Sequence, residues 1–310
     1  MSTLSTRLEE YLRLRRQLGF KLRVPGILLP SFVRFARRRG ASFITTKLAL
    51  EWATQPANIG SPQRANRLGM VRRFAEYLSA VDPRTEVPPQ KLIPYQFRRR
   101  QPYLYTDEEV LQMMRAMRHL GPRDGLKGAT YATLVGLLAV TGMRVGEAIG
   151  LDRGDVDLNQ AALTVRRAKG NKSRLVPLHP STQQALERYA ALRDRAFPEP
   201  VSRAFLVSET GARLLHCTVN RWFLSVCCHL GWRKPRHRDG PRLHDLRHYF
   251  AVRTLLGWYR SNADVEARLP ELATYLGHVH VRDSYWYLTA TPELLKLATL
   301  RWERSEKRQK

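Results

Sequence analysis

Apolar side chains recur at every third or fourth position along most of the first hundred residues, which is the spacing of one face of an α-helix. In the first such stretch, Leu4, Leu8, Leu12 and Leu14 with Tyr11 form the apolar side of an amphipathic helix. Further along, Ser61 and Pro62 are typical of an N-cap followed by the first helical position. The pattern predicts four helices, at residues 4–14, 28–39, 46–53 and 61–80.

A basic, proline-rich stretch ends this helical region. Five prolines lie between positions 83 and 102, and three consecutive arginines occupy positions 98–100. Prolines lack the backbone donor that helices and sheets need, so this stretch is expected to be extended. It predicts a helical domain at residues 1–95, a linker at 96–105 and a second domain at 106–310.

The second domain is predicted to be mainly helical with one small β-sheet. Thr106 and Glu109 form a capping-box sequence that starts a helix, and helical spacing resumes from residue 128 to about 151. Residues 162–165 and 174–178 alternate between apolar and polar side chains on either side of a Gly-Asn turn, which predicts a β-hairpin. Further helices are expected at residues 181–196, 217–230, 243–256, 265–276 and 292–305. The expected fold class is therefore mainly α with a small β-sheet, in two domains.

The charge of the chain narrows the choice of partner. Of its 310 residues, 53 are Lys or Arg and 27 are Asp or Glu, which gives a formal net charge of +26. Only ten of the basic residues are lysine, and arginine is the better bidentate ligand for phosphate. The excess is +14 over residues 1–100 and +12 over the rest. A compact protein tolerates such repulsion best beside a polyanion, so we expect nucleic acid as the partner.

Several other classes of protein lack support in the sequence. The three cysteines form no CxxC pair of the kind that binds zinc, and they are too few for a disulfide framework. The charged N-terminus lacks the apolar core of a signal peptide, and the most apolar stretch, residues 132–143, is too short to span a membrane. No phosphate-binding GxxxxGK[ST] loop or carboxylate cluster is present. We expect a cytoplasmic protein with no membrane contact, cofactor or metal.

Two clusters in the first half of the second domain carry basic side chains. Arg144 follows an apolar helix and lies one helical turn before Glu147. An arginine beside a buried segment needs an anionic partner, which is either a ligand or Glu147 itself. The hairpin turn carries Lys169, and a lysine on such a turn can donate a proton to a ligand. An exposed basic turn is the simpler interpretation of that lysine taken alone.

Two more clusters lie in the second half. His244 and Arg247 are three residues apart on a predicted helix, so they share a face that could present both side chains to one phosphate. His278 follows a glycine at a predicted helix end, and Tyr287 comes nine residues later. The order in which these side-chain types follow one another along the chain is a more specific indication of function than any one cluster.

That order resembles the tyrosine recombinases, also called phage-type integrases. An arginine, a hairpin lysine, a His-x-x-Arg pair, a Gly-His pair and a tyrosine follow one another within residues 106–305. The helical N-terminal domain is similar in layout only. The resemblance implies a core-binding domain and a catalytic domain that close around duplex DNA. It also implies site-specific strand exchange through a covalent 3′-phosphotyrosine, for integration, excision or transposition of a mobile element, without metal or ATP.

On this resemblance Tyr287 is the nucleophile and Lys169 is the general acid that protonates the 5′-oxygen leaving group. Each has a neighbour of the same type. Tyr287 is favoured over Tyr285 by its spacing from the Gly-His pair, and Tyr285 is then expected to be a packing aromatic. Lys169 is favoured over Lys172 because it is the first lysine of the turn.

The resemblance assigns the other four residues to the scissile phosphate and to proton transfer. Arg144 and Arg247 would clamp the non-bridging oxygens of the phosphate. His278 would add a donor there, and it is preferred to His280 because only His278 follows Leu-Gly. His244 would assist proton transfer near the nucleophile.

Two neighbouring features are not part of this set. His248 directly follows the His-x-x-Arg pair and is expected to lie behind the site or on the surface. Residues 257–264 make the connection between Arg247 and His278 longer than the family commonly shows. The path of the chain through this insertion is not predicted by the resemblance, but the insertion removes none of the six residues.

The resemblance implies double-stranded DNA as the partner, a homo- or hetero-tetramer of protomers on two synapsed sites, and a place in the cytoplasm at the nucleoid. The apolar helix expected at 292–305 would pack on its own domain or on a neighbouring protomer. A type IB topoisomerase that relaxes one duplex is an alternative with the same chemistry. A DNA-binding protein that has lost activity is another alternative, and an RNA-binding protein is a third, although no RRM or KH signature is present.

Overall fold

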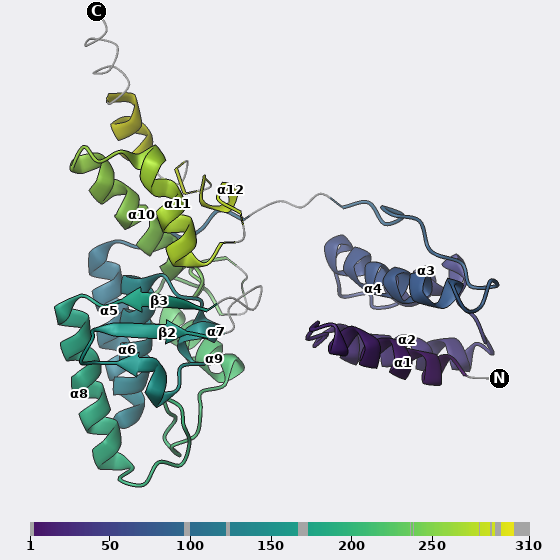
Figure 1. The fold of residues 1–310 in the computed structure, drawn as a ribbon, viewed down its shortest axis with the longest axis horizontal. Coiled ribbons are helices and arrows are strands. Elements are labelled where there is room, and N and C mark those ends of the chain that lie inside the picture. Colours follow the sequence, from purple (N-terminus) through teal and green to yellow (C-terminus); the bar gives the residue numbers. More distant parts are fainter. Residues whose placement is uncertain are drawn as a thin grey trace, which may run out of the picture. The chain divides into compact units, whose positions relative to one another are not determined.

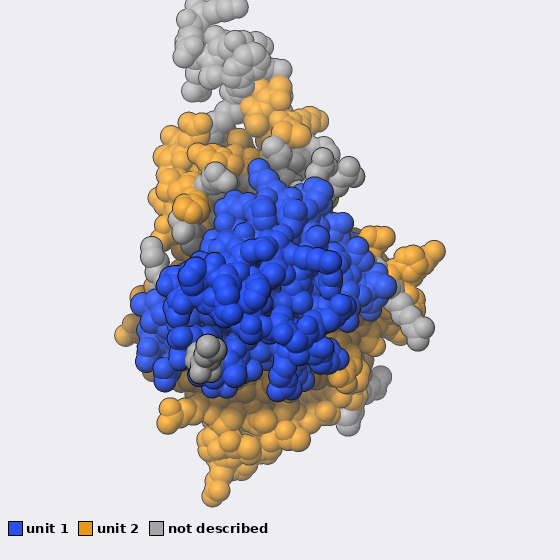
Figure 2. All heavy atoms as spheres, turned by 90° about the vertical axis from the view of Figure 1, so that its right-hand side faces the viewer, with its two compact units in different colours: residues 1–100 blue, residues 101–310 orange. Residues whose placement is uncertain are grey.

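The computed structural model divides into two compact units, Met1–Arg100 and Gln101–Lys310 (Figure 1; Figure 2). It describes residues 3–95, 100–121, 125–166, 173–235, 237, 239–278, 280–285, 287–288 and 293–300. Within these residues no helix is long and apolar enough to cross a membrane. Each unit buries apolar side chains in a core of its own, so each is described by itself.

Four helices form the first unit: α1 (Leu4–Gln17), α2 (Pro25–Arg38), α3 (Thr46–Thr54) and α4 (Ser61–Ser79). The four predicted helices are confirmed, although α2 begins three residues earlier than expected, at a proline suited to the first turn. The prediction that Ser61 is the N-cap of α4 is wrong. The cap is Gly60, whose N–H donates to the Gln63 side chain at 3.3 Å, so Ser61 already belongs to the helix.

The core of the first unit is built around aromatic side chains. Trp52 is 1% exposed and packs edge-to-face on Phe32, with 5.4 Å between the ring centroids. The Arg67 guanidinium lies 3.8 Å from the centre of the Trp52 ring and donates to the Trp52 carbonyl at 2.9 Å. Arg72 donates to the Pro88 carbonyl at 3.0 Å. Two arginines of α4 therefore hold the unit itself together.

The second unit opens with the predicted capping box. Thr106 accepts from the Glu109 N–H at 3.1 Å, and Glu109 accepts from the Thr106 N–H at 2.8 Å, at the start of α5 (Asp107–Arg118). The helical spacing expected over 128–151 is shared by two helices, with Arg144 at the start of the second. The chain forms α6 (Leu126–Thr141) and a separate α7 (Val145–Ala148), because Gly142 has a φ of +59° and ends α6 in the left-handed region.

A small antiparallel sheet follows, with strands in the order β1 (Val156–Asp157), β2 (Ala162–Val165) and β3 (Arg174–Pro177), after a short 3₁₀ helix at Arg153–Asp155. The hairpin of β2 and β3 confirms the prediction, and β1 is an additional strand.

The later helices are α8 (Pro180–Ala196), α9 (His216–His229), α10 (Asp245–Arg260), α11 (Val265–Leu276) and α12 (Arg282–Tyr285). Residues 293–300 are helical, and the other residues of the helix expected at 292–305 lie outside the described part of the chain.

Helix α6 is the centre of the second unit, with 11 of its 16 residues buried. It contacts α5, α8 and α10, and the apolar side chains of β2 and β3 join the same core (Figure 1). A smaller core lies between α10, α11 and the residues that follow them, and it includes Tyr287 and Leu294. The mainly helical fold class with a small sheet is therefore confirmed. The ends of α6, α10 and α11 meet between the two cores, where the candidate site lies.

Candidate active site

Arg144 is fixed at the break between α6 and α7. It is the N-cap residue of α7, and Glu147 accepts from its backbone N–H at 3.0 Å and from its Nη1 at 2.8 Å. Its Nη2 donates to the Gly277 carbonyl at 3.2 Å. The internal ion pair that the sequence left open is therefore formed. A guanidinium has five N–H donors, so this arrangement still leaves donors for an anion, and the Arg144 side chain is 27% exposed.

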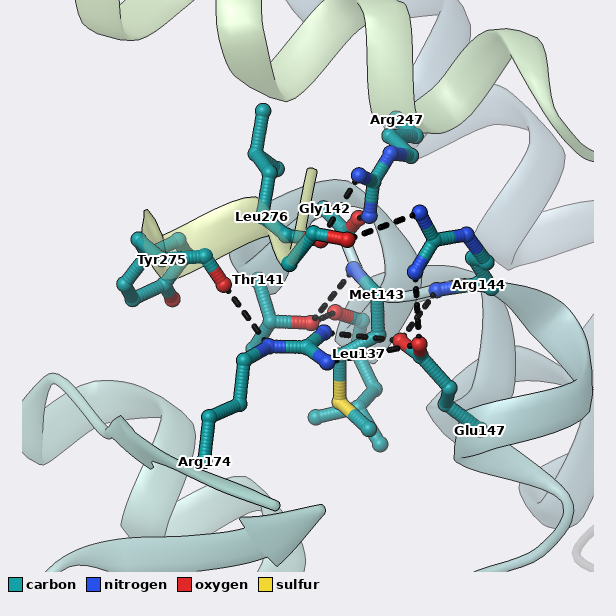
Figure 3. A network of polar contacts seen from close by, with 11 residues as sticks. Leu137, Thr141, Gly142, Met143, Arg144, Glu147, Arg174, Arg247, Tyr275 and Leu276 are labelled. Carbon is teal, nitrogen blue, oxygen red and sulfur yellow. Dashed lines mark hydrogen bonds and ion pairs between the residues drawn. The ribbon is translucent and has the colours of Figure 1, made fainter. Parts of the chain in front are cut away.

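Glu147 is shared between two arginines (Figure 3). Arg174 of β3 donates to it from Nη2 at 2.7 Å and from Nη1 at 3.3 Å, in addition to the bonds from Arg144. Burial of the Glu147 carboxyl acts to raise its pKa, but the hydrogen bonds from Arg174 and Arg144 and the charge of Arg174 outweigh burial and lower the pKa below its ordinary value. Glu147 is therefore ionised near neutral pH.

Arg247, in the first turn of α10, is buried to 2% exposure and held by main-chain oxygens. Its Nη1 donates to the Gly142 carbonyl at 2.9 Å, and its Nη2 donates to the Leu276 carbonyl at 2.7 Å (Figure 3). Burial lowers the pKa of Arg247 to about 10, which still leaves it protonated at neutral pH, and the nearby Tyr287 opposes that shift. Carbonyls orient the side chain without cancelling its charge, so the buried cation is prepared for an anionic ligand.

Two histidine rings lie beside this arginine. His244 is the N-cap residue of α10 rather than an interior residue of that helix, and burial together with the charge of Arg247 lowers its pKa. The His244 ring packs edge-on against His248, with 5.3 Å between the ring centroids. His248 is 5% exposed and its ring lies 5.3 Å from that of Tyr287, so of the two places expected for it, the one behind the site is correct and the surface is wrong.

His278 also packs against Tyr287. It follows Gly277, which ends α11 in the left-handed region with a φ of +67°. The His278 ring stacks on the Tyr287 ring with 6.0 Å between centroids and 18° between planes, and its Nδ1 bonds the Ser284 hydroxyl at 2.7 Å. That contact orients the imidazole ring beside Tyr287.

Tyr287 and Tyr285 differ sharply in their surroundings. Tyr287 is 2% exposed and belongs to the smaller core with α10 and α11. Tyr285 is 54% exposed, so the expectation that it is a packing aromatic is wrong: it lies on the outer side of the short helix α12. Of the two tyrosines, the one buried among the basic residues is the one that the spacing favoured.

The structure thus brings together five of the six residues singled out in the sequence: Arg144, Arg247, His244, His278 and Tyr287. Lys169 and its neighbour Lys172 lie outside the described residues. His280, the neighbour of His278, is exposed. The catalytic roles of the six residues remain predictions. The arrangement surrounds one tyrosine with guanidinium and imidazole groups, which suits a phosphate diester as the ligand.

Three residues of this region were not predicted from the sequence. Arg174 binds Glu147, Ser284 orients His278, and Asp245 is fully buried beneath the site, where it pairs with Arg242 at 2.7 Å. Only Asp245 left a usable signal, because it stands three residues after an arginine, at the spacing of a pair within one helical turn. The other two contacts depend on tertiary structure.

Substitution of Gly142 by alanine is expected to destabilise the protein. A Cβ at this position would lie 2.5 Å from Phe250 Cδ1 and 2.9 Å from Leu276 Cδ2, and φ is +59°. We expect a loss of about 2 kcal/mol in the free energy of unfolding, measured from the shift of the urea midpoint. Gly146→Ala is the matched control, since nothing lies within 4 Å of a Cβ there. Equal midpoints for the two variants would contradict the strain assigned to Gly142.

Comparison with known proteins gives consistent matches, which cover most of the second unit for the family model and nearly the whole chain for one relative. The family model described as the phage integrase family matches residues 104–293. The putative integrase/recombinase y4rB of Sinorhizobium fredii is 44% identical over 308 residues, which cover 98% of both chains. The tyrosine recombinase XerD of Mycobacterium leprae is 31% identical over 203 residues, 64% of this chain and 60% of that protein.

Solved structures share the fold at lower identity. The Tn1549 transposon integrase in complex with transposon right end DNA has a TM-score of 0.65 and 15% identity, and the match covers 96% of this chain and 98% of that one. A lambda integrase dimer bound to a COC′ core site has a TM-score of 0.62 and 18% identity, with 94% of this chain and 97% of that one covered. Both units of the present chain therefore have counterparts in these two structures.

Proposed function

We propose, from the premise that the chain belongs to the phage integrase family of tyrosine recombinases, that it cuts and rejoins DNA through a 3′-phosphotyrosine intermediate. The strand exchange would serve integration, excision or transposition of a mobile element. The observation that carries this proposal is that Arg247, His248 and His278 lie beside the buried Tyr287, with Arg144 and His244 close to Arg247.

The two arginines are suited to hold a scissile phosphate. Arg247 is fixed by two carbonyls and Arg144 by Glu147 and Gly277, so both guanidinium groups are oriented before a ligand arrives. Preorganised donors stabilise the charge that develops on the non-bridging oxygens in the transition state. His278 would add one more donor on the family resemblance, and its contact with Ser284 fixes the orientation of the ring.

The chemistry conserves the energy of the phosphodiester. The Tyr287 oxygen would form a bond to phosphorus while the bond to the 5′-oxygen breaks. His244 would take the phenolic proton, and Lys169, on the family resemblance, would protonate the departing 5′-oxygen. The reverse reaction with another 5′-hydroxyl then reseals the strand, so neither ATP nor net hydrolysis is needed.

Double-stranded DNA is the partner that the charge of the chain and the DNA-bound integrases of the same fold support. The first unit would act as the core-binding domain, and the protein would reside at the nucleoid. Synapsis of two sites would require a tetramer of identical or related protomers. In the helix at residues 293–300, Leu294 is buried in its own domain, whereas Leu295 and Leu300 remain exposed and would contact a neighbouring protomer.

The test is covalent capture on a nicked duplex taken from the borders of the element that carries the gene. The nick lets the short 5′-hydroxyl fragment leave, so the phosphotyrosine cannot be reversed and a denaturation-resistant adduct accumulates. We expect the adduct in the presence of EDTA. Absence of an adduct with every border sequence would contradict strand cleavage, and relaxation of supercoiled plasmid without recombination would indicate the topoisomerase alternative.

The rate of cleavage is expected to fall at acidic pH, as His244 becomes protonated. Burial and Arg247 lower the pKa of His244 from its ordinary 6.5, so the imidazole stays neutral, and able to accept a proton, until the pH is below that value. Single-turnover rates of the wild-type protein should therefore begin to fall below pH 6.5.

The control variants separate His244 from other titrating groups. His244→Gln should cleave slowly, and its rate should no longer fall at acidic pH, because glutamine does not titrate. His179→Gln should keep the wild-type profile, since His179 is exposed and caps α8. If the rate of His244→Gln still falls at acidic pH, a group other than His244 accepts the phenolic proton.

A further inference from the structure

Arg174 connects three segments that are distant in sequence. It lies on β3, and its Nε donates to the Tyr275 carbonyl at the end of α11 at 2.7 Å. Its two Nη atoms donate to both oxygens of Glu147 on α7, at 2.7 and 3.3 Å (Figure 3). The Arg174 side chain is 12% exposed. All three nitrogens of one guanidinium are thus used within the protein, which fixes its plane.

The two segments that Arg174 binds also hold the arginines assigned to the phosphate, Arg144 and Arg247. Glu147 binds the Nη1 and the backbone N–H of Arg144. The turn after Tyr275 supplies the Leu276 carbonyl to Arg247 and the Gly277 carbonyl to Arg144. A Cβ at position 277 would lie 3.0 Å from Arg174 Nη1, so the glycine allows the guanidinium to lie close against this turn. Arg174 therefore contacts the supports of Arg144 and Arg247 without being one of the family's six residues.

The charges explain why a second arginine is useful at Glu147. The carboxylate is 9% exposed, and within the described part of the chain its ion pairs are with Arg144 and Arg174. Without Arg174, the attraction of a buried, ionised carboxylate would fall on Arg144 alone. Arg144 would then be drawn toward Glu147 and away from an incoming phosphate.

We propose that Arg174 is a positioning residue for strand cleavage, which shares the charge of Glu147 so that the Arg144 guanidinium stays available to the scissile phosphate. This role rests on the proposed function, since it concerns the same site. Arg174 itself does not contact the reacting atoms. A displacement of a clamp group by about 1 Å is enough to lower a rate by about 100-fold.

The experiment compares variants of the full-length protein in the covalent-capture assay at saturating protein. Arg174→Met should cleave about 100-fold more slowly than wild type, with unchanged affinity for the duplex, at a temperature at which both proteins are folded. Its melting temperature should fall, because Glu147 and the Tyr275 carbonyl each lose a buried donor. Arg174→Lys should fall between the two, because a lysine keeps the charge but cannot bridge both oxygens and a carbonyl. Arg153→Met is the matched control, since Arg153 pairs with Asp194 at 2.8 Å between two other elements. It should cleave at the wild-type rate.

A double variant separates positioning from a merely structural role. With Glu147→Gln added to Arg174→Met, the carboxylate that draws Arg144 away is neutral, so the double variant should cleave faster than Arg174→Met alone. A double variant that is no faster, or Arg174→Met at the wild-type rate, would overturn the role assigned to Arg174. Absence of an adduct from both wild type and Arg153→Met would instead overturn the proposed function, and the role of Arg174 with it.

Discussion

Tyr287→Phe is expected to abolish the covalent protein–DNA adduct while leaving DNA binding and folding intact. The substitution removes one hydroxyl and keeps the ring that stacks on His278 and packs in the smaller core. No other group can take over a reaction in which the tyrosine oxygen forms the bond to phosphorus. The measurement is adduct formation on the nicked duplex, with binding followed separately by electrophoretic mobility.

Tyr285→Phe is the matched control for this prediction. The two tyrosines are two residues apart, but Tyr285 is 54% exposed and Tyr287 is 2% exposed. Tyr285→Phe should form the adduct at the wild-type rate. The opposite pattern, with the adduct lost only in Tyr285→Phe, would move the nucleophile to α12.

Arg144→Ala and Arg247→Ala are each expected to slow cleavage by about 100- to 1000-fold, because each removes preorganised donors from the developing phosphate charge. Affinity for the duplex should change far less, since many other basic residues neutralise the DNA backbone. The measurement is the single-turnover rate at saturating protein, which separates the chemical step from binding.

Arg247 needs a second variant, because its removal leaves the carbonyls of Gly142 and Leu276 without their donor in a buried place. Arg247→Lys keeps the charge and most of the volume, but a lysine cannot present the forked donors of a guanidinium. It should fold and still cleave far more slowly than wild type. Wild-type rates in Arg247→Lys and Arg144→Ala would exclude a phosphate clamp built from these two residues.

Much of the fold could be predicted from the sequence because its signals are local. The capping box at Thr106 and Glu109, the hairpin of β2 and β3 and the apolar stripe of α1 each depend on residues that are neighbours along the chain. The residue at which α6 ends could not be predicted in the same way. The apolar spacing continues through Gly142, and only tertiary contacts with Phe250 and Leu276 show why the chain turns there.

The candidate site, like the fold, could be predicted only in part from the sequence. The resemblance identified the residues that would touch DNA, and the structure places five of them together. It could not identify Arg174, whose partners Glu147 and Tyr275 are 27 and 101 residues away. The burial of His248 and the exposure of Tyr285 are likewise set by how α10 and α12 pack, which periodicity over a few residues does not determine.

The anchoring of Arg247 has a consequence for how such a protein can evolve. Its two acceptors are peptide carbonyls, which every residue type supplies, so Leu276 can be replaced by another apolar residue during divergence without loss of an acceptor. Gly142 lacks this freedom because of its left-handed backbone. The position of the buried arginine is therefore inherited with the path of the main chain. A lineage can change most of its surface, and with it the DNA sequence that it selects, while the geometry for breaking a strand persists.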